Sequence, residues 1–421
     1  MLDQRELVRN KEIAVAKLGL RNVPREEVED TIDLLRQRNT LRTATDELIA
    51  TSRKCREAFV QQQGTTGVHN LFITPIPAEL NKFKQQIDFS EASHRSVAEL
   101  AHAKLIGLPN FPDEDTAKTP SSRIVREVTG RERSCNLRIP HWTLAEHLGI
   151  GNSSAALKIS GPGYMVLTGD GARLIRALES FALEQLGDKY REVCFPHLMN
   201  DAALYGSGHL PKFAAGAYKI EGEPIWAIPT AEVPLVGLHR DEKIKLEALP
   251  LCYMTNMHCF RKEIGGGGKD SRWRLHEYHQ VELMRICTPS QAEENYTELV
   301  NDTVACLGLL GVPYRLIKLC PADLPFSAAR AYRLDAYSYG SDTWLPISMA
   351  SLFYDFQARR SNIKYQGKTE GGFVTTMNSS ALAVSRLWGI LLEQGVEADG
   401  RVQIPHVLRP FMGKDFIQTY K

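Results

Sequence analysis

The spacing of apolar residues predicts two long helices near the start of the chain. Residues 25–63 follow Pro24, contain no Gly or Pro, and carry a thin apolar stripe at helical spacing. A second stripe over about 78–106 recurs in steps of three and four, as in a heptad seam, although Ser90 and His94 lie within it. Because each helix has one narrow apolar stripe, we expect an antiparallel hairpin over about 25–106, inside an N-terminal region of residues 1–110.

A different pattern begins after residue 110. From His141 onward, short strand-like runs outnumber the helices and do not alternate with them one by one. Helices are predicted at 170–187 and 381–394, and strands at 191–196, 225–229, 259–263, 279–287, 314–320 and 347–360. The predicted fold class is α+β, with an antiparallel sheet flanked by helices over residues 111–421.

The composition of the chain excludes only a few classes of protein. The 421 residues are 43% hydrophobic and 24% charged with a formal net charge of +1, so no global field attracts nucleic acid or a membrane. No apolar run approaches the roughly 18 residues that span a bilayer. The eight cysteines form no CxxC pair, so neither a zinc ribbon nor a disulfide framework is indicated. The first twenty residues mix acids with bases, unlike a transit peptide.

Two short stretches carry candidate chemistry. In "CFRKE", Arg261 and Glu263 are two apart on a predicted strand, so both would lie on one face and could hold a phosphate and an amino group. A surface ion pair explains the same spacing. In "AIPTAEVPL", a hydroxyl and a carboxylate at Thr230 and Glu232 would suit an ammonium group. A loop with a capping threonine explains that pattern equally well.

Two other stretches point away from common sites. "IGGGGKDS" is not a P-loop, because Lys269 is followed by Asp270 rather than by Ser or Thr. "HEYH" at 276–279 does not match HExxH, and on a strand its two histidines would point to opposite faces. We interpret them as two ordinary strand histidines.

Taken in order, five segments resemble the seryl-tRNA synthetases, a class II aminoacyl-tRNA synthetase family. They are TAEVPL, CFRKE, HEYHQVE, DFQARRSNIKY and MNSSALAVSR. "LIGLPNFP", "GDGARLIRALESFALEQLG" with "REVCFP", and "DGRVQIPHVLRPFMG" extend the similarity over almost the whole chain. The resemblance implies a class II antiparallel sheet behind a helical arm. It also implies that serine attacks the α-phosphate of ATP and then passes to tRNA.

The resemblance also assigns roles to single residues. Arg261 and Glu263 match the α-phosphate arginine and its glutamate, Tyr278 stands where a phenylalanine stacks on adenine, and Arg386 matches the motif 3 arginine. Thr230 and Glu232 match the residues that hold the serine amino group. Glu282 matches the glutamate near the serine side chain, and Ser380 belongs to the same serine site.

The chain departs from the family pattern at the metal and nucleotide site. The family's magnesium-binding Glu and Ser are Pro346 and Met349 here, and neither has a hard oxygen ligand in its side chain. Three motif 3 glycines are replaced by Ser379, Ala381 and Ser385, whose Cβ atoms we expect to intrude on the nucleotide.

From these losses we expect a non-catalytic paralogue with no catalytic residues, no metal site, and lost or weak ATP and Mg²⁺ binding. It resembles the seryl-tRNA synthetase-like proteins of insect mitochondria, which implies mitochondrial residence. A divergent but active serine–tRNA ligase is the alternative. A scaffold that keeps only the dimer surface, without tRNA, is a third hypothesis.

The resemblance implies two kinds of partner and no membrane. The first is tRNA, in particular serine tRNA, on the helical hairpin. Two basic groups there are candidates, although a solvated helix face with i,i+4 ion pairs is the competing explanation: Arg36, Arg38 and Arg42, and Arg53, Lys54 and Arg56. The second is a dimer partner, either a second copy or the genuine mitochondrial synthetase, expected on the apolar helix of residues 171–186 and the strand that ends at Pro196.

Overall fold

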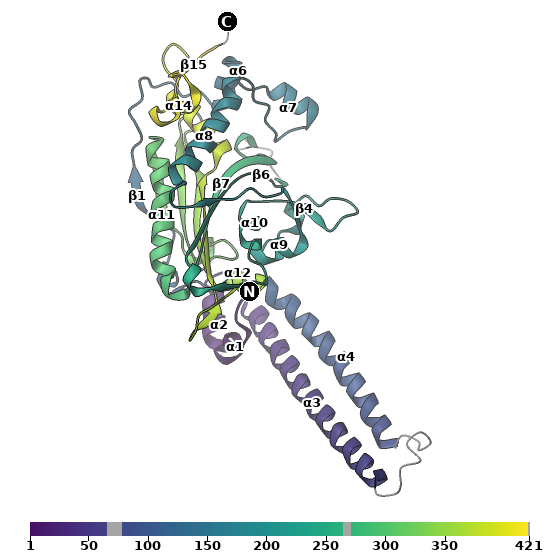
Figure 1. The fold of residues 1–421 in the computed structure, drawn as a ribbon. Coiled ribbons are helices and arrows are strands. Elements are labelled where there is room, and N and C mark those ends of the chain that lie inside the picture. Colours follow the sequence, from purple (N-terminus) through teal and green to yellow (C-terminus); the bar gives the residue numbers. More distant parts are fainter. Residues whose placement is uncertain (65–77, 264–270, 420–421) are drawn as a thin grey trace. The chain divides into compact units, whose positions relative to one another are not determined.

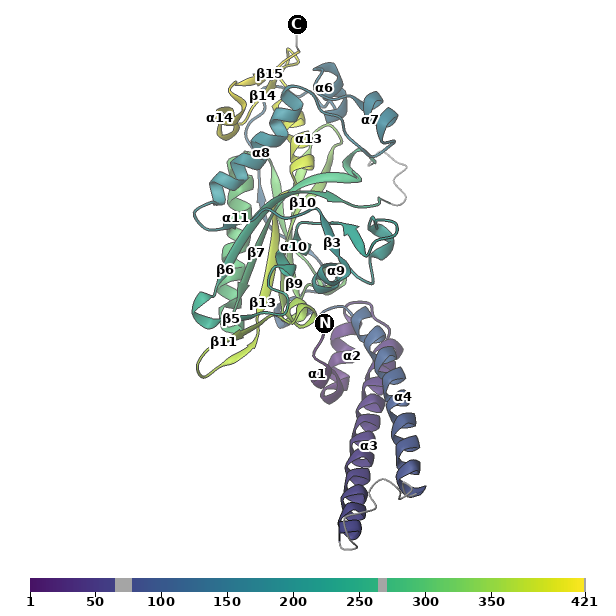
Figure 2. The ribbon, with the colours of Figure 1, turned by 45° about the vertical axis from the view of Figure 1, so that its right-hand side comes forward.

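The computed structural model describes residues 1–64, 78–263 and 271–419, and the chain divides into two compact units. Leu2–Pro109 forms the smaller unit, and Met1 with Asn110–Lys421 forms the larger one. Figures 1 and 2 label their elements. "IGGGGKDS" lies almost entirely outside the described residues.

The smaller unit is helical. It comprises α1 (Gln4–Arg9), α2 (Lys11–Gly19), α3 (Arg25–Gly64) and α4 (Ala78–Gly107). The long helices α3 and α4 pack against each other, as the apolar stripes predict (Figure 1). Val28, Ile32 and Leu35 are fully buried near the start of α3. The polar Ser90 is accommodated because its hydroxyl lies 2.6 Å from that of Thr45, so the buried pair satisfies its own hydrogen bonds.

The larger unit is built on an eight-stranded sheet with the order β1-β8-β9-β10-β13-β7-β6-β2. All of its pairs are antiparallel except β2 with β6. The strands are β1 (Arg123–Val128), β2 (Arg191–Glu192), β6 (Leu251–Phe260), β7 (Glu277–Cys287), β8 (Tyr314–Lys318), β9 (Arg330–Ser338), β10 (Thr343–Tyr354) and β13 (Thr375–Leu382). The predicted α+β class is confirmed.

Helices cover this sheet and complete the main core. The long helices α8 (Asp170–Leu186), α11 (Ala292–Leu309) and α13 (Val384–Gly395) pack on its central strands (Figure 2). The short helices are α5 (Glu114–Ala117), α6 (His141–His147), α7 (Ser153–Ile159), α9 (Asp201–Ser207), α10 (Glu232–Gly237), α12 (Phe356–Ser361) and α14 (Arg409–Met412). Minor strands are β3 (Leu198–Asn200), β4 (Ile225–Ala227), β5 (Lys243–Lys245), β11 (Lys364–Gln366), β12 (Gly371–Phe373), β14 (Val402–Gln403) and β15 (Phe416–Ile417).

Several predicted boundaries differ from the structure. The strand predicted over 347–360 ends at Tyr354, whose φ of 49° turns the chain out of the sheet and into α12. The helix predicted from residue 381 begins at Val384, because residues 381–382 still belong to β13. The strand predicted over 191–196 is only Arg191–Glu192.

The apolar face of α8 is buried within its own chain. Leu174, Leu178, Phe181 and Leu186 all belong to the main core. This apolar face therefore needs no dimer partner to cover it, contrary to the expectation from the sequence. Among the residues that the structure describes, no helix combines the length and apolarity needed to cross a membrane.

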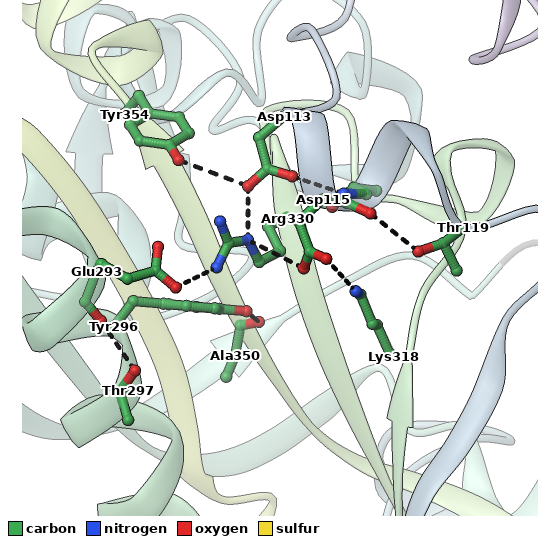
Figure 3. Close-up of polar contacts among 11 residues, drawn as sticks. Asp113, Asp115, Thr119, Glu293, Tyr296, Thr297, Lys318, Arg330, Ala350 and Tyr354 are labelled. Atoms are coloured by element: carbon green, nitrogen blue, oxygen red, sulfur yellow. Dashed lines mark hydrogen bonds and ion pairs between the residues drawn. The ribbon is translucent and has the colours of Figure 1, made fainter.

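An ion network fixes the first residues of the larger unit to the sheet (Figure 3). The guanidinium of Arg330 on β9 donates to Asp113 Oδ2 across 2.5 Å and to Glu293 Oε1 across 2.6 Å. Lys318 on β8 donates to Asp115 across 2.7 Å, and Asp113 also caps α5 through the amide of Thr116. These contacts anchor the segment that precedes β1 to β8, β9 and α11.

A second polar cluster is centred on the buried carboxylate of Glu393 on α13. Its Oε1 accepts hydrogen bonds from the backbone amide of His141, at 3.0 Å, and lies 3.1 Å from His141 Nδ1. Its Oε2 accepts from the amide of Gly340 and the hydroxyl of Ser338. One carboxylate therefore joins α6, the turn after β9, and α13.

Candidate active site

A cavity of about 720 Å³ lies in the larger unit, between β6, β7, β10, β13 and the segment after α9. Most of the site residues predicted from the sequence line it: Thr230, Glu232, Arg261, Glu263, Tyr278, Glu282, Pro346, Met349, Ser380, Ser385 and Arg386. Two predicted positions, Ser379 and Ala381, are not among its lining residues. The motifs therefore meet at one place although they span more than half of the larger unit.

One end of the cavity contains the carboxylate of Glu232. This residue begins α10, whose N-cap is Ala231 rather than Thr230. The backbone amide of Glu232 donates to the hydroxyl of Thr230 across 3.3 Å, so Thr230 contacts the first turn from the position before the cap. The side-chain amide of Gln357 donates to Glu232 Oε1, and Gln357 is itself held by Thr376 across 2.8 Å. Burial raises the pKa of Glu232 to about 7, against the opposing effect of these hydrogen bonds.

A second carboxylate, Glu282 on β7, lies deeper and is 1% exposed. Its Oε1 accepts from the side-chain amide of Asn378 across 2.7 Å, and its Oε2 accepts from that of Gln280. Burial raises the pKa of Glu282 well above its ordinary value, and the nearby charge of Glu232 adds to the effect. This end of the cavity therefore contains two carboxyl groups whose ionisation is disfavoured by burial. A ligand with a positive charge or with hydrogen-bond donors would offset that cost, so such a ligand fits this end.

Arginines line another part of the same cavity. Arg261 follows the end of β6 at Phe260, so the strand geometry expected to align Arg261 with Glu263 does not apply. Its guanidinium contacts the carbonyl of Pro229 at 3.3 Å and the hydroxyl of Tyr278 at 3.4 Å, and that hydroxyl donates to the same carbonyl across 2.6 Å. The phenol that replaces a phenylalanine is therefore a polar anchor beside Arg261.

Arg386, at the start of α13, also lines the cavity. Its Nε donates to the carbonyl of Trp273 across 3.4 Å, and its Nη1 donates to the carbonyl of Pro346. Pro346 thus orients the arginine through its backbone although its side chain offers no ligand. Arg261 and Arg386 together give the cavity two guanidinium groups suited to phosphate oxygens.

The two positions that hold magnesium ligands in the family pattern line this cavity with changed side chains. No group of three or more His, Cys, Asp and Glu side chains is arranged to hold a metal ion in residues 1–64, 78–263 and 271–419. Pro346 and Met349 line the cavity without an oxygen in their side chains. A magnesium ion in this cavity would depend on phosphate oxygens and water, which it commonly keeps as ligands.

The replaced glycines affect the cavity less than the sequence suggests. Ser379 is fully buried, and its hydroxyl accepts from Thr303 on α11 across 2.9 Å, behind the sheet. Ala381 packs in the main core. Ser385 does line the cavity, where its hydroxyl accepts from the backbone amide of His279 across 3.0 Å. The expectation that all three side chains intrude on a nucleotide is therefore wrong for Ser379 and Ala381.

The candidate RNA-binding residues all lie on α3, and half of them are in intrahelical ion pairs. Arg36 pairs with Asp33, Arg42 with Asp46, and Arg53 with Glu57, at 3.4, 4.0 and 3.0 Å. Arg38 donates to Gln4 across 2.7 Å and also contacts Asn39. Lys54 and Arg56 are exposed. The i,i+4 explanation is thus realised for Arg42 and Arg53, whereas Lys54 and Arg56 remain suited to phosphate contacts.

Sequence reasoning missed three amide side chains that hold the carboxylates. Gln280, Gln357 and Asn378 all lie within the motifs, yet they received no role. A signal was present for Gln280, because residues two apart on a strand share a face and Glu282 follows it by two. Gln357 and Asn378 are brought to the site only by the fold.

Comparison with known proteins places these features in a family. The tRNA synthetase class II core domain (G, H, P, S and T) matches residues 218–395. The chain is 37% identical to the serine–tRNA ligase of Synechococcus sp. (strain RCC307) over 423 residues, covering 99% of each chain. It is 34% identical to that of Picosynechococcus sp. (strain ATCC 27264 / PCC 7002 / PR-6), covering 99% of this chain and 100% of the relative.

Solved structures of seryl-tRNA synthetases also match this chain over its full length. The seryl-tRNA synthetase of Pyrococcus horikoshii complexed with ATP superposes with a TM-score of 0.90 at 27% identity over the full length of both chains. The cytoplasmic serine–tRNA ligase of Naegleria fowleri in complex with AMP, at 24% identity and a TM-score of 0.83, shares the fold.

These relatives overturn the expectation of a non-catalytic paralogue that has lost ATP and Mg²⁺. The full-length relatives are serine–tRNA ligases, and the P. horikoshii structure holds ATP. The relatives do not point to the insect mitochondrial proteins in particular. The physical reason for the error is visible in the cavity: Ser379 and Ala381 face away from it, while both carboxylates and both arginines remain.

Proposed function

The chain belongs to the seryl-tRNA synthetase family, and from this premise we propose that it is an active serine–tRNA ligase that uses ATP and Mg²⁺. The observation that carries the proposal is the meeting of a buried carboxylate end and an arginine-lined region in one cavity of about 720 Å³. An amino acid and a nucleotide have the complementary charges.

Each residue then has a chemical part in the first step. Thr230 and Glu232 receive the serine ammonium group, and Glu282 accepts a hydrogen bond from the serine hydroxyl. Arg261 contacts the α-phosphate, and Arg386 binds the nucleotide. A serine carboxylate oxygen attacks the α-phosphorus, the bond to pyrophosphate breaks, and seryl-adenylate forms. The arginines stabilise the charge that develops on the phosphate oxygens.

The second step transfers serine from the adenylate to the end of a tRNA. The proposed RNA is serine tRNA, and α3 with α4 is the proposed contact region. The M. kandleri seryl-tRNA synthetase, solved in complex with A. aeolicus tRNASec, shares the fold of this chain at 16% identity and a TM-score of 0.58. Support within this chain comes from the exposed Lys54 and Arg56.

The proposed assembly is a dimer of two copies of this chain. Its basis is the edge of the large sheet rather than the apolar face of α8. The edge strand β2 pairs only with β6 within the described residues, and most of residues 191–198 are exposed. Mitochondrial residence stays a prediction from the resemblance.

Serine-dependent exchange between ATP and pyrophosphate tests the function directly. We expect exchange with serine and Mg²⁺, and charging of a serine tRNA by the same preparation. Glu232→Gln is the control, because it removes the proposed ammonium ligand while keeping its size. Exchange no faster in the native chain than in this variant, with no charged tRNA, would contradict the proposal.

A further inference from the structure

The side chain of Gln280 joins both halves of the carboxylate end of the cavity. It lies on β7 two residues before Glu282, lines the cavity, and is 6% exposed. Its Oε1 accepts from the hydroxyl of Thr230 across 3.2 Å and from the amide of Ala231 across 3.4 Å. Its Nε2 donates to Glu282 Oε2 and, across 2.7 Å, to the hydroxyl of Ser380.

These partners allow only one orientation of the amide. The groups around Oε1 include a backbone N–H, which can only donate, and the groups around Nε2 include a carboxylate, which accepts. A reversed amide would place two donors against each other at Ala231 and two acceptors against each other at Glu282. The direction of every hydrogen bond around Gln280 is therefore fixed by the fold.

The fixed direction determines what Thr230 and Glu282 present to the cavity. The hydroxyl proton of Thr230 is directed to Gln280, and one lone pair receives the amide of Glu232 at 3.3 Å. The remaining lone pair can only accept. Glu282 is bound by Gln280 at one oxygen and by Asn378 at the other, which holds its carboxylate plane in place. Thr230 and Glu282 therefore both favour a ligand that donates hydrogen bonds to them.

We propose that Gln280 is a positioning residue that sets Thr230 and Glu282 as acceptors, and thereby selects an amino acid with a small hydroxylated side chain over one without a hydroxyl. This inference rests on the proposed function and names how its site recognises the substrate. Alanine has no hydroxyl to donate to the buried Glu282, so its binding would gain no hydrogen bond there in exchange for the water that it displaces.

Gln280→Met tests the inference, because methionine has a similar length and cannot make the amide hydrogen bonds. We expect the KM for serine to rise about 10- to 100-fold, as for the loss of hydrogen bonds to charged groups. The KM for ATP should change less than about 2-fold, and the ratio of kcat/KM for serine to that for alanine should fall.

A matched control separates positioning from folding. Gln394→Met removes an equally buried amide that donates to the carbonyl of Gly311 and does not line the cavity. We expect normal KM values for this variant. If Gln280→Met leaves the KM for serine within about 2-fold, or raises the KM values for serine and ATP alike, the inference is wrong.

Gln280→Glu gives a second readout that does not depend on the methionine variant folding. It keeps the acceptor for Thr230 but places a second carboxylate beside Glu282, and Glu232, Cys259, Arg261 and Tyr278 are the other titratable groups nearby. Two adjacent carboxylates share a proton more readily at low pH. The activity of this variant relative to the native chain should therefore rise from pH 8.5 to pH 6. A ratio independent of pH contradicts the inference.

Calorimetry distinguishes failure of the inference from failure of the proposed function. If the native chain shows no exchange but binds serine more tightly than alanine, and Gln280→Met abolishes this preference, the activity is refuted and the positioning role stands. If exchange occurs and the preference is unchanged in Gln280→Met, only the positioning role is refuted. Absence of both exchange and serine binding overturns both.

Discussion

The hydroxyl of Thr303 on α11 donates to the hydroxyl of Ser379 on β13 across 2.9 Å. Ser379 occupies a position that is glycine in the family pattern, yet its side chain points behind the sheet. Ser379→Gly should therefore leave the KM for ATP within about 2-fold of the native value. It should lower the free energy of unfolding by about 1 kcal/mol, because a buried hydrogen bond is lost. Exchange kinetics and denaturant unfolding check the two parts, and a large gain in ATP affinity would show that Ser379 obstructs the nucleotide.

The raised pKa of Glu232, about 7, predicts how serine use depends on pH. Below pH 7 this carboxyl keeps its proton and cannot pair with the serine ammonium group. The kcat/KM for serine should thus fall about tenfold per pH unit as the pH drops below 7, and level off above about 8. A profile of exchange rates at subsaturating serine measures this. In Glu232→Gln the remaining activity should lose that inflection.

Arg386 should matter for ATP far more than for serine. Its Nε and Nη1 are held by the carbonyls of Trp273 and Pro346, so the guanidinium is oriented before the nucleotide arrives. Arg386→Ala should lower kcat/KM for ATP about 10²- to 10³-fold. Arg386→Lys should recover little of it, since one ammonium cannot make both contacts. Exchange at varied ATP checks this, and an equal loss for serine would point to general damage to the cavity.

The basic residues of α3 should contribute unequally to RNA binding. Lys54→Ala with Arg56→Ala should weaken binding to all tRNAs and reduce the slope of log affinity against log salt by roughly one unit per lost phosphate contact. Arg53→Ala should have a smaller effect, because Arg53 already pairs with Glu57. Filter binding at several salt concentrations measures the slopes. Lys158→Ala, an exposed lysine on α7, is the control, and an equal loss there would show that α3 is not the RNA contact.

The network around Arg330 should be a stability determinant of the larger unit. Arg330→Met would leave Asp113, whose side chain is 8% exposed, without its main cation. We expect a loss of about 3–5 kcal/mol in the free energy of unfolding of this unit, measured by denaturant titration. Asp113→Asn in the same background should restore part of it, because it removes the uncompensated charge; no restoration would mean that the charge is not the cause.

The sequence predicted elements and motifs better than contacts. Apolar periodicity depends directly on local structure, so it was sufficient to predict α3, α4 and the strands of the sheet. Periodicity did not predict the break at Tyr354, whose positive φ ends β10 and leads into α12 within a segment predicted as one strand. Motif matching also identified residues that line the cavity, because the motifs follow one another along this chain in the same order as in the family.

The side-chain directions were not predictable in the same way. Ser379 and Ser380 are neighbours on β13, yet one faces α11 and the other lines the cavity. Counting substitutions without this alternation made the nucleotide site look more damaged than it is. Glu232 accepts from Gln357, 125 residues away along the chain, and Glu282 accepts from Asn378, 96 residues away.

The carboxylate of Glu393 has a consequence for the order in which the protein can be made. This carboxylate accepts hydrogen bonds from the backbone amides of His141 and Gly340, and His141 also lines the cavity. His141 and Glu393 are 252 positions apart, so the amide of His141 lacks its acceptor until nearly the whole chain has been translated. Contacts so distant along the chain form late and slowly. A ribosome that stalls before α13 would therefore release a product with an unfinished cavity wall, suited to capture by chaperones rather than to binding ATP.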